Sequence, residues 1–165
     1  KSCELLNHTY HHLYAINTIN LRFFTVFGER QRPDLAIHKF VKRALNNEPI
    51  TLYGDGSTSR DYTYIQDIVD GIWRSYQYLE SNENVFQVIN LGNNSPIKLS
   101  ELVEMIYSIL QKEPIIEYLP MQAGDVERTY ADISSANKIL GYKPQTSMQK
   151  GLENFIAWYQ LQVIS

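Results

Sequence analysis

The sequence contains a single cysteine, Cys3, and has no apolar run long enough to cross a membrane. One cysteine cannot form a disulfide within the chain, and a cysteine-based metal site would lack its other ligands. A membrane span needs about 18 or more consecutive apolar residues. Residues 1–15 also lack the charged and then apolar order of a secretion signal. We therefore expect a soluble, cytoplasmic protein with no disulfide framework and no membrane association.

The sequence also has little excess charge of either sign. Its 165 residues include 15 Lys and Arg against 18 Asp and Glu, a formal net charge of −3. A protein that tracks a nucleic-acid backbone usually carries a basic patch and a basic pI, so this composition argues against a nucleic-acid partner. Apolar and aromatic residues make up 44% of the chain. That fraction is enough for one domain that buries roughly 70% of its unfolded surface.

Two common motifs are missing. No Gly-x-Gly-x-x-Gly occurs, because Gly54 and Gly56 are followed by Ser-Thr-Ser-Arg, so the chain by itself does not supply a Rossmann phosphate loop. No His-Glu-x-x-His occurs either. His8 and His12 share one helical face, but no acidic third ligand is placed with them. We therefore expect no metal site.

The pattern of apolar residues predicts strands that alternate with helices. Apolar residues at helical spacing predict helices over residues 2–14, 35–45, 65–79, 102–110, 134–140 and 148–159. Short apolar runs predict strands over residues 17–27, 50–53, 85–91 and 115–119. Residues 17–27 are apolar almost throughout, which predicts burial on both faces, as in a parallel sheet. The alternation predicts an α/β fold with parallel crossovers.

Three local features follow from single residues. Ser100 is placed to cap the helix that carries Leu102 to Leu110. Gly141 suits a left-handed cap at the C-terminus of the helix over 134–140. His38 stands among basic residues, which predicts that it lies on the solvent-exposed side of its helix.

The segment from Gly54 to Asp67 carries the strongest chemical signal. A flexible loop here places Arg60 beside backbone amides and hydroxyls, just before a long helix. A forked cation with several donors is what a phosphate or diphosphate group requires. The alternative is that Arg60 pairs with Asp61 or Asp67 and only fixes the loop.

Weaker signals lie elsewhere in the chain. Arg30 and Arg32 follow a predicted strand, at the end where open α/β sheets place ligands, so they either clamp an anion or lie in an ordinary solvated loop. Tyr53 ends a predicted strand and either stacks on a base or is structural, like most of the 12 tyrosines. Asp125 follows a glycine and either accepts hydrogen bonds from a sugar diol or anchors its loop, for example through Arg128.

Several motifs occur in the order of a known family. They are Leu21-Arg-Phe-Phe-Thr-Val-Phe-Gly28, Arg32-Pro-Asp-Leu-Ala-Ile-His-Lys-Phe40, Leu52-Tyr-Gly-Asp-Gly56, Arg60-Asp-Tyr-Thr-Tyr-Ile65, Asp67-Ile68, Gly124-Asp-Val126 and Ala131-Asp-Ile-Ser134. Through them the chain resembles an extended short-chain dehydrogenase/reductase of the NAD-dependent epimerase/dehydratase family over essentially its whole length. Within that family it most resembles the UDP-glucuronate and UDP-glucose 4-epimerases.

The start of the chain, from Lys1 to Leu5, is similar to the stretch that follows the family's Tyr-x-x-x-Lys motif. The resemblance implies that the catalytic Tyr and Lys lie just upstream of Lys1, so we expect no catalytic residue in this chain. The chain would then be the C-terminal half of the enzyme, inactive alone. Residues from about 1 to 30 would end the Rossmann-type NAD-binding sheet, and residues from about 31 to 165 would mainly form the smaller α/β substrate-binding domain.

The activity implied by the resemblance is that of an NAD-dependent UDP-sugar 4-epimerase. NAD takes hydride from C4 of the sugar, the resulting 4-keto sugar turns over, and hydride returns to its other face. Phe23, Phe24 and Thr25 are implied to line the NAD pocket, with Thr25 also facing the sugar. Arg32 is implied to meet a glucuronate carboxylate. The helix over 2–14 is implied to pair two subunits in a homodimer.

The resemblance also implies a set of contacts to the nucleotide. Arg60 would hold the diphosphate, Thr51 and Tyr53 would border the uracil, and Asp125 would take the ribose hydroxyls. Contacts through the loop shaped by Pro33 would come from Asp34 and Leu35.

The sequence departs from the family pattern at two places. Gln122 stands where some galactose epimerases carry a second phosphate-binding Arg, and Phe27-Gly28-Glu29 replaces Tyr-Gly-Pro. The alternatives are a related nucleotide-sugar dehydratase or decarboxylase, or a non-catalytic interaction module on the same scaffold.

Overall fold

The computed structural model describes residues 1–121 and 124–164. Within these residues the helices are α1 (Ser2–Tyr14), α2 (Ala36–Leu45), α3 (Ile65–Ser81), α4 (Leu99–Leu110), α5 (Ser134–Leu140) and α6 (Met148–Ile164). The strands are β1 (Thr18–Phe23), β2 (Thr25–Phe27), β3 (Ile50–Tyr53), β4 (Ser59–Arg60), β5 (Tyr62–Tyr64), β6 (Phe86–Leu91), β7 (Ile97–Lys98) and β8 (Ile116–Leu119). Each predicted helix is present, and the predicted α/β class is confirmed.

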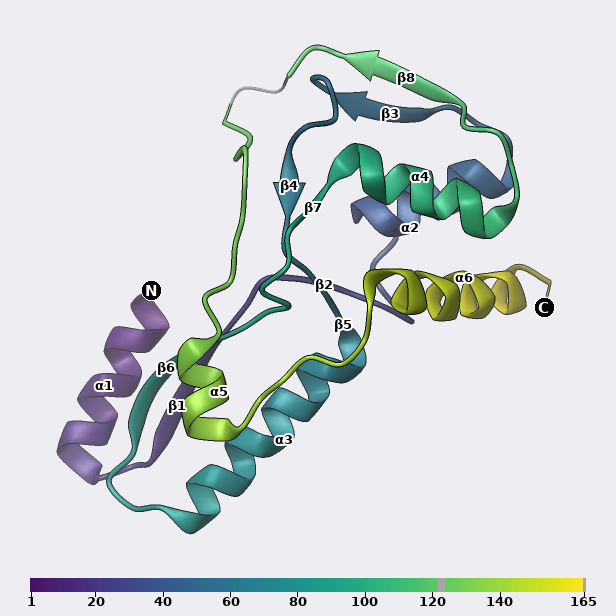
Figure 1. The fold of residues 1–165 in the computed structure, drawn as a ribbon. Coiled ribbons are helices and arrows are strands. Elements are labelled where there is room, and N and C mark those ends of the chain that lie inside the picture. The colour runs from purple at the N-terminus through teal and green to yellow at the C-terminus, as the bar shows by residue number, and fades with distance from the viewer. Residues whose placement is uncertain (122–123, 165) are drawn as a thin grey trace.

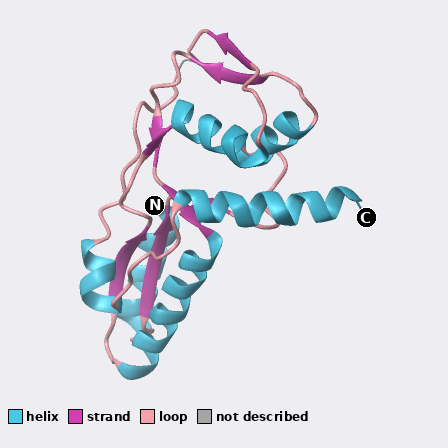
Figure 2. Cartoon of the chain, turned by 45° about the vertical axis from the view of Figure 1, so that its right-hand side comes forward, coloured by secondary structure: helices cyan, strands magenta, loops and turns pink. Residues whose placement is uncertain are grey.

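The elements form two layered groups (Figure 1). In one group β1 and β6 pair in parallel, with α1 on one face and α3 and α5 on the other (Figure 2). In the other group α2, α4 and α6 pack together beside the parallel pair β3–β8. The parallel pair β2–β5 runs between the two groups. A buried cluster of apolar side chains fills each group.

The predicted strand over 17–27 is divided in the structure. It breaks at Phe24 into β1, which pairs with β6, and β2, which pairs with β5. The predicted burial on both faces is wrong, because Asn20 is the one residue of β1 that is buried and Phe23 is 49% exposed. The physical reason is that, among the described residues, β6 is the one strand paired with β1. The other edge of β1 therefore has no strand beside it in this part of the chain.

Three short strands, β4, β5 and β7, were not predicted. The expectation of a flexible loop around Arg60 is wrong. Strand β4 pairs antiparallel with β7 and places Arg60 opposite Ile97. Strands of two or three residues are too short to show an alternating pattern, and their pairing depends on residues distant in the chain.

Two local predictions are also wrong. The N-cap of α4 is Lys98, whose backbone N–H donates to the Glu101 carboxylate at 3.4 Å, so Ser100 lies inside the helix instead of capping it. His38 is 9% exposed and not on a solvent-exposed face, because α6 brings Phe155 and Tyr159 against its ring. The left-handed cap is confirmed, since φ of Gly141 is 63°.

Within the described residues, no helix is both long and apolar enough to span a bilayer. In the same part of the chain no group of three or more His, Cys, Asp and Glu side chains is arranged to hold a metal ion.

Candidate functional site

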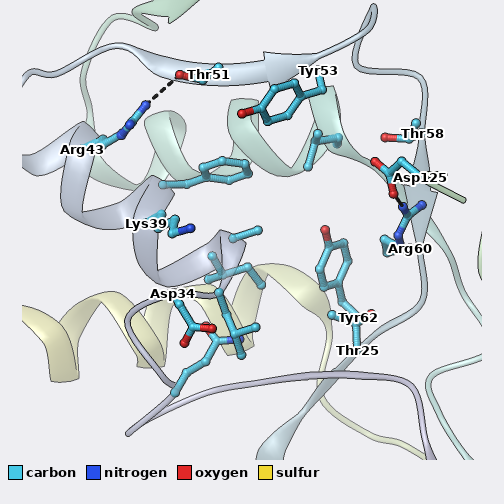
Figure 3. A pocket seen from close by; sticks show the side chains of 16 residues that line it. Thr25, Asp34, Lys39, Arg43, Thr51, Tyr53, Thr58, Arg60, Tyr62 and Asp125 are labelled. Carbon is cyan, nitrogen blue, oxygen red and sulfur yellow. Dashed lines mark hydrogen bonds and ion pairs between the residues drawn. The ribbon is translucent and has the colours of Figure 1, made fainter. Parts of the chain in front are cut away.

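A cleft of about 420 Å³ opens between α2, β3 and the β4–β5 segment (Figure 3). Its walls come from segments far apart in the sequence. The residues that line it and that also belong to the expected site are Thr25, Asp34, Leu35, Thr51, Tyr53, Arg60 and Asp125. The tertiary structure thus brings most of the expected nucleotide-contacting positions to one cavity.

Three of the expected site residues do not line this cleft. Arg32 is exposed and forms an ion pair with Asp34, with Nη2 3.3 Å from Oδ2, so it stands beside a lining residue. Phe23 is half-exposed at the carboxyl end of β1, and Phe24 lies at the break between β1 and β2. The expectation for Gln122 falls outside the described residues.

Arg60 and Asp125 form a charged pair at one side of the cleft (Figure 3). The Arg60 Nη2 donates to Asp125 Oδ1 at 2.6 Å, and Nη1 donates to the carbonyl of Ser59 at 3.0 Å. Pairing of Arg60 with Asp61 or Asp67, the alternative left open by the sequence, is therefore wrong. Among the described residues Asp125 forms its ion pair with Arg60 and not with Arg128, whose guanidinium lies 5.5 Å from the centre of the Tyr130 ring.

Asp61 is a buried positioning group behind this pair. Its carboxylate accepts the backbone N–H of Asn93 at 2.8 Å and that of Ala131 at 2.9 Å. Its own carbonyl accepts the backbone N–H of Thr25 at 3.1 Å. One residue thus ties together the segments that carry Arg60 and Thr25. Sequence analysis missed this role, since nothing local marks a buried carboxylate.

Arg43 forms a second polar corner on the other side of the cleft (Figure 3). It extends from α2, and its Nη1 donates to Thr51 Oγ1 at 2.8 Å and to the carbonyl of Pro49 at 3.1 Å. Lys39, one helical turn earlier, also lines the cleft. The spacing of four residues in a predicted helix would have placed the two cations on one face. It could not have shown that this face looks into a cavity.

The charge and polarity of the lining fit an anionic ligand with a flat polar ring. Three cationic side chains face two acidic ones in the lining, namely Lys39, Arg43, Arg60, Asp34 and Asp125. Burial raises the pKa of Tyr62, which also lines the cleft, to about 12. The cleft therefore offers charged donors for an anion and the aromatic side chains of Phe40 and Tyr53 for a planar group.

Comparison with known proteins shows where this architecture occurs. A family model described as GDP-mannose 4,6 dehydratase matches residues 1–155. The chain is 47% identical over 159 residues to an uncharacterized protein of Methanocaldococcus jannaschii, covering 96% of this chain and 48% of that protein. It is 39% identical over 159 residues to a UDP-glucuronate 4-epimerase of Thermodesulfobacterium geofontis, covering 96% of this chain and 48% of that enzyme.

A solved structure gives the same picture in three dimensions. The crystal structure of UDP-glucuronic acid 4-epimerase from Bacillus cereus, in complex with UDP-glucuronic acid and NAD, matches with a TM-score of 0.90 at 35% identity. The match covers 98% of this chain and 51% of that one. The chain thus spans about half the length of the relatives it matches.

The resemblance inferred from the motifs is confirmed, and NAD is the cofactor of the family. A match over residues 1–155 and a shared fold show that the chain belongs to the GDP-mannose 4,6 dehydratase family of NAD-dependent epimerases and dehydratases, within the extended short-chain dehydrogenases/reductases.

Proposed function

We propose that the chain forms the UDP-sugar-binding part of an NAD-dependent UDP-sugar 4-epimerase, with residues from about 31 to 165 forming mainly that binding domain. The observation that carries the proposal is the convergence of Arg60, Asp125, Thr51 and Tyr53 on one cleft. Relatives solved with UDP-glucuronic acid or UDP-glucose support the same class of ligand.

Each part of the nucleotide has a partner in the cleft. Arg60 holds the diphosphate with the donors that its bonds to Asp125 and to the Ser59 carbonyl leave free. A charge-assisted hydrogen bond contributes about 1.5–3 kcal/mol. Asp125 takes the ribose hydroxyls with its second oxygen. Thr51 and Tyr53 border the uracil, and a further wall comes from Asp34 and Leu35. Most of the binding energy then comes from the UDP portion, which leaves the sugar free to turn over.

The sugar and the cofactor lie beyond the cleft in this proposal. Arg32, exposed beside Asp34, meets a sugar carboxylate with its forked donors. Phe23 is 49% exposed at the end of β1, two residues before Thr25, which lines the cleft, so this chain offers NAD an uncovered aromatic side chain. NAD, when bound, supplies the hydride acceptor and donor at C4 of the sugar. We place no catalytic residue in this chain.

The proposed assembly is a homodimer through α1. The outward face of this helix carries exposed leucines, with Leu5 65%, Leu6 57% and Leu13 61% exposed. Contiguous exposed apolar side chains of this kind mark association surfaces. A second copy of α1 would cover them.

The second candidate is a nucleotide-sugar dehydratase. The observation in its favour is that the family model matching residues 1–155 is described as a dehydratase. Both reactions begin with oxidation at C4, so the cleft described here would serve either one.

Product analysis tests the activity. The full-length protein is incubated with NAD and UDP-glucuronate, then with UDP-glucose, and the sugar products are followed by NMR. An epimerase yields a product of unchanged mass with inverted C4, whereas a dehydratase releases water and a decarboxylase releases carbon dioxide.

Calorimetric titration of UDP tests the binding site separately. Arg60→Ala is expected to weaken UDP binding about tenfold or more, the loss of one charge-assisted hydrogen bond. The matched control is Arg74→Ala, which removes an arginine that also pairs with an aspartate, Asp70, but outside the cleft. An unchanged dissociation constant for Arg60→Ala would reject the diphosphate role.

A further inference from the structure

Arg32 lies in a loop whose backbone is hydrogen-bonded on both sides of this residue. The carbonyl of Gln31, which belongs to the same peptide group as the Arg32 nitrogen, accepts a hydrogen bond from Nδ1 of His38 at 3.0 Å. The carbonyl of Arg32 accepts the backbone N–H of Leu35 at 3.2 Å. Both peptide planes that flank the Arg32 Cα are therefore held, and with them the direction in which its side chain leaves the loop.

The ring of His38 is itself held in one orientation. A carbonyl oxygen only accepts hydrogen bonds, so the bonded Nδ1 carries a hydrogen. The ring is buried, and the rings of Phe155 and Tyr159 on α6 pack against it with centroids 5.8 and 5.1 Å away. A ring enclosed by other rings has few rotamers open to it. The Nδ1 donor thus keeps its direction toward the loop.

His38 stands behind the cleft. Three residues of the loop line the cleft, namely Gln31, Asp34 and Leu35. In the described part of the chain His38 is not among the lining residues. An effect of His38 on a ligand must therefore pass through the loop that it holds.

We propose that His38 is a positioning residue for the sugar end of the substrate and acts by holding the peptide between Gln31 and Arg32. The inference rests on the proposed function, in which Arg32 meets the carboxylate of a UDP-sugar. A forked contact between a guanidinium and a carboxylate depends on direction. The Arg32 side chain is 73% exposed, so the loop backbone, more than side-chain packing, decides where its guanidinium reaches.

A merely structural role of His38 makes a different prediction. The ring also belongs to the packing between α2 and α6, so its loss lowers the stability of the fold in either case. Lower stability reduces the fraction of binding-competent protein, which weakens every ligand to the same extent. A positioning role changes the ratio of the affinities for UDP-glucuronate and UDP-glucose, because only the first carries a carboxylate. The ratio is therefore the quantity to measure.

The experiment is calorimetric titration of UDP-glucuronate, UDP-glucose and UDP into the full-length protein and its variants. His38→Phe keeps an aromatic ring against Phe155 and Tyr159 and removes the donor. We expect it to weaken UDP-glucuronate about three- to tenfold relative to UDP-glucose, the worth of one hydrogen bond, and to change the affinity for UDP less than about twofold.

The matched control is Tyr107→Phe. Tyr107 is buried on α4 and also donates from its side chain to a backbone carbonyl, that of Ile115 at 3.2 Å. It is not among the described residues that line the cleft, so its variant should keep the wild-type ratio. A double variant isolates the route of the effect. Because His38 acts through Arg32, adding His38→Phe to Arg32→Ala should leave the ratio at the value of Arg32→Ala alone.

The outcomes separate the two proposals. A wild-type protein that does not bind UDP overturns the proposed function and this inference with it. A ratio that Arg32→Ala leaves unchanged removes the carboxylate contact, and the role of His38 with it. A ratio that responds to Arg32→Ala but not to His38→Phe overturns the inference alone. So does an equal effect of His38→Phe with and without Arg32. If His38→Phe does not fold, His38→Leu removes the same donor with less bulk and decides by the same ratio.

Discussion

Arg60 and Asp61 are neighbours in the chain, yet their side chains serve opposite environments. Arg60 reaches the cleft and bonds Asp125 across 65 residues of sequence, with Nη2 2.6 Å from Oδ1. Asp61 is fully buried and accepts two backbone N–H groups, from Asn93 and Ala131. A cation that lines the cleft is therefore followed in the chain by a buried anchor, and the anchor fixes its position.

Asp61→Asn should destabilise the fold strongly. One of the two backbone donors would then face an amide NH₂ instead of an oxygen, and hydrogen bonds to a charged group contribute about 1.5–3 kcal/mol. We expect the free energy of unfolding in urea to fall by about 2–4 kcal/mol. Asp70→Asn, at a partly exposed ion pair with Arg74, should lower it by less than about 1 kcal/mol. Equal losses for the two variants would contradict the anchoring role.

Gly92 permits a close approach behind the cleft. A Cβ added at Gly92 would lie 2.2 Å from the Cβ of Ala131, the residue whose N–H is bound by Asp61. Gly92→Ala should therefore lower the free energy of unfolding by about 1–3 kcal/mol through overpacking. The double variant Gly92→Ala with Ala131→Gly removes the clashing carbon and should recover part of that loss. Thermal or urea unfolding measures the stability of both variants. If the double variant loses more free energy of unfolding than the two single variants together, the clash between these two carbons is not the cause.

The contact between α1 and β1 predicts a pH dependence of stability. Arg22 donates two hydrogen bonds of 2.7 Å to Glu4 and lowers the pKa of that carboxyl to about 2. Since the folded pKa lies below the ordinary value of 4.5, the contribution is present above that value and is lost as the pH falls toward 2. Wild type should thus exceed Glu4→Gln in urea midpoint at about pH 6 and lose that advantage near about pH 2. A difference independent of pH would contradict the ionic contact.

Arg32→Ala should discriminate between sugars. If Arg32 meets a carboxylate, its removal should raise KM for UDP-glucuronate about tenfold more than KM for UDP-glucose, because only the former has the charge. The control is Arg30→Asn, since Arg30 is exposed on the same loop with φ of 64°, a conformation that Asn tolerates. If the two KM values rise equally, Arg32 does not contact the carboxylate, and Lys39→Ala, which removes a cation lining the cleft, becomes the next variant to measure.

The exposed leucines of α1 predict that charged substitutions on this helix prevent dimer formation. Leu6→Lys combined with Leu13→Lys places charges on the proposed dimer face and should yield a monomer in sedimentation velocity. Tyr118→Lys changes a side chain that is 58% exposed on β8, away from α1, and should leave the dimer intact. A dimer that persists in the α1 variant would place the subunit contact elsewhere.

Local sequence patterns were sufficient to predict the helices, the strands β3, β6 and β8, and the family of this protein. Apolar residues at spacings of three and four predict helices because neighbouring turns must bury one face. The helix over 134–140 ends at Gly141 because a left-handed residue closes it. Arg60 was identified as an anion-binding candidate from the donors beside it in the chain, which is also local information.

Which side chains meet depends on packing between distant elements, and no local pattern records it. The Arg60–Asp125 pair, the Arg43–Thr51 corner and the burial of His38 under α6 depend on how helices and very short strands pack against one another. A two-residue strand such as β4 has no periodicity, and its position is fixed by pairing with β7 and by the buried carboxylate of Asp61. The sequence specifies which functional groups the side chains carry. Which of these groups lie close together depends on packing between elements far apart in the chain.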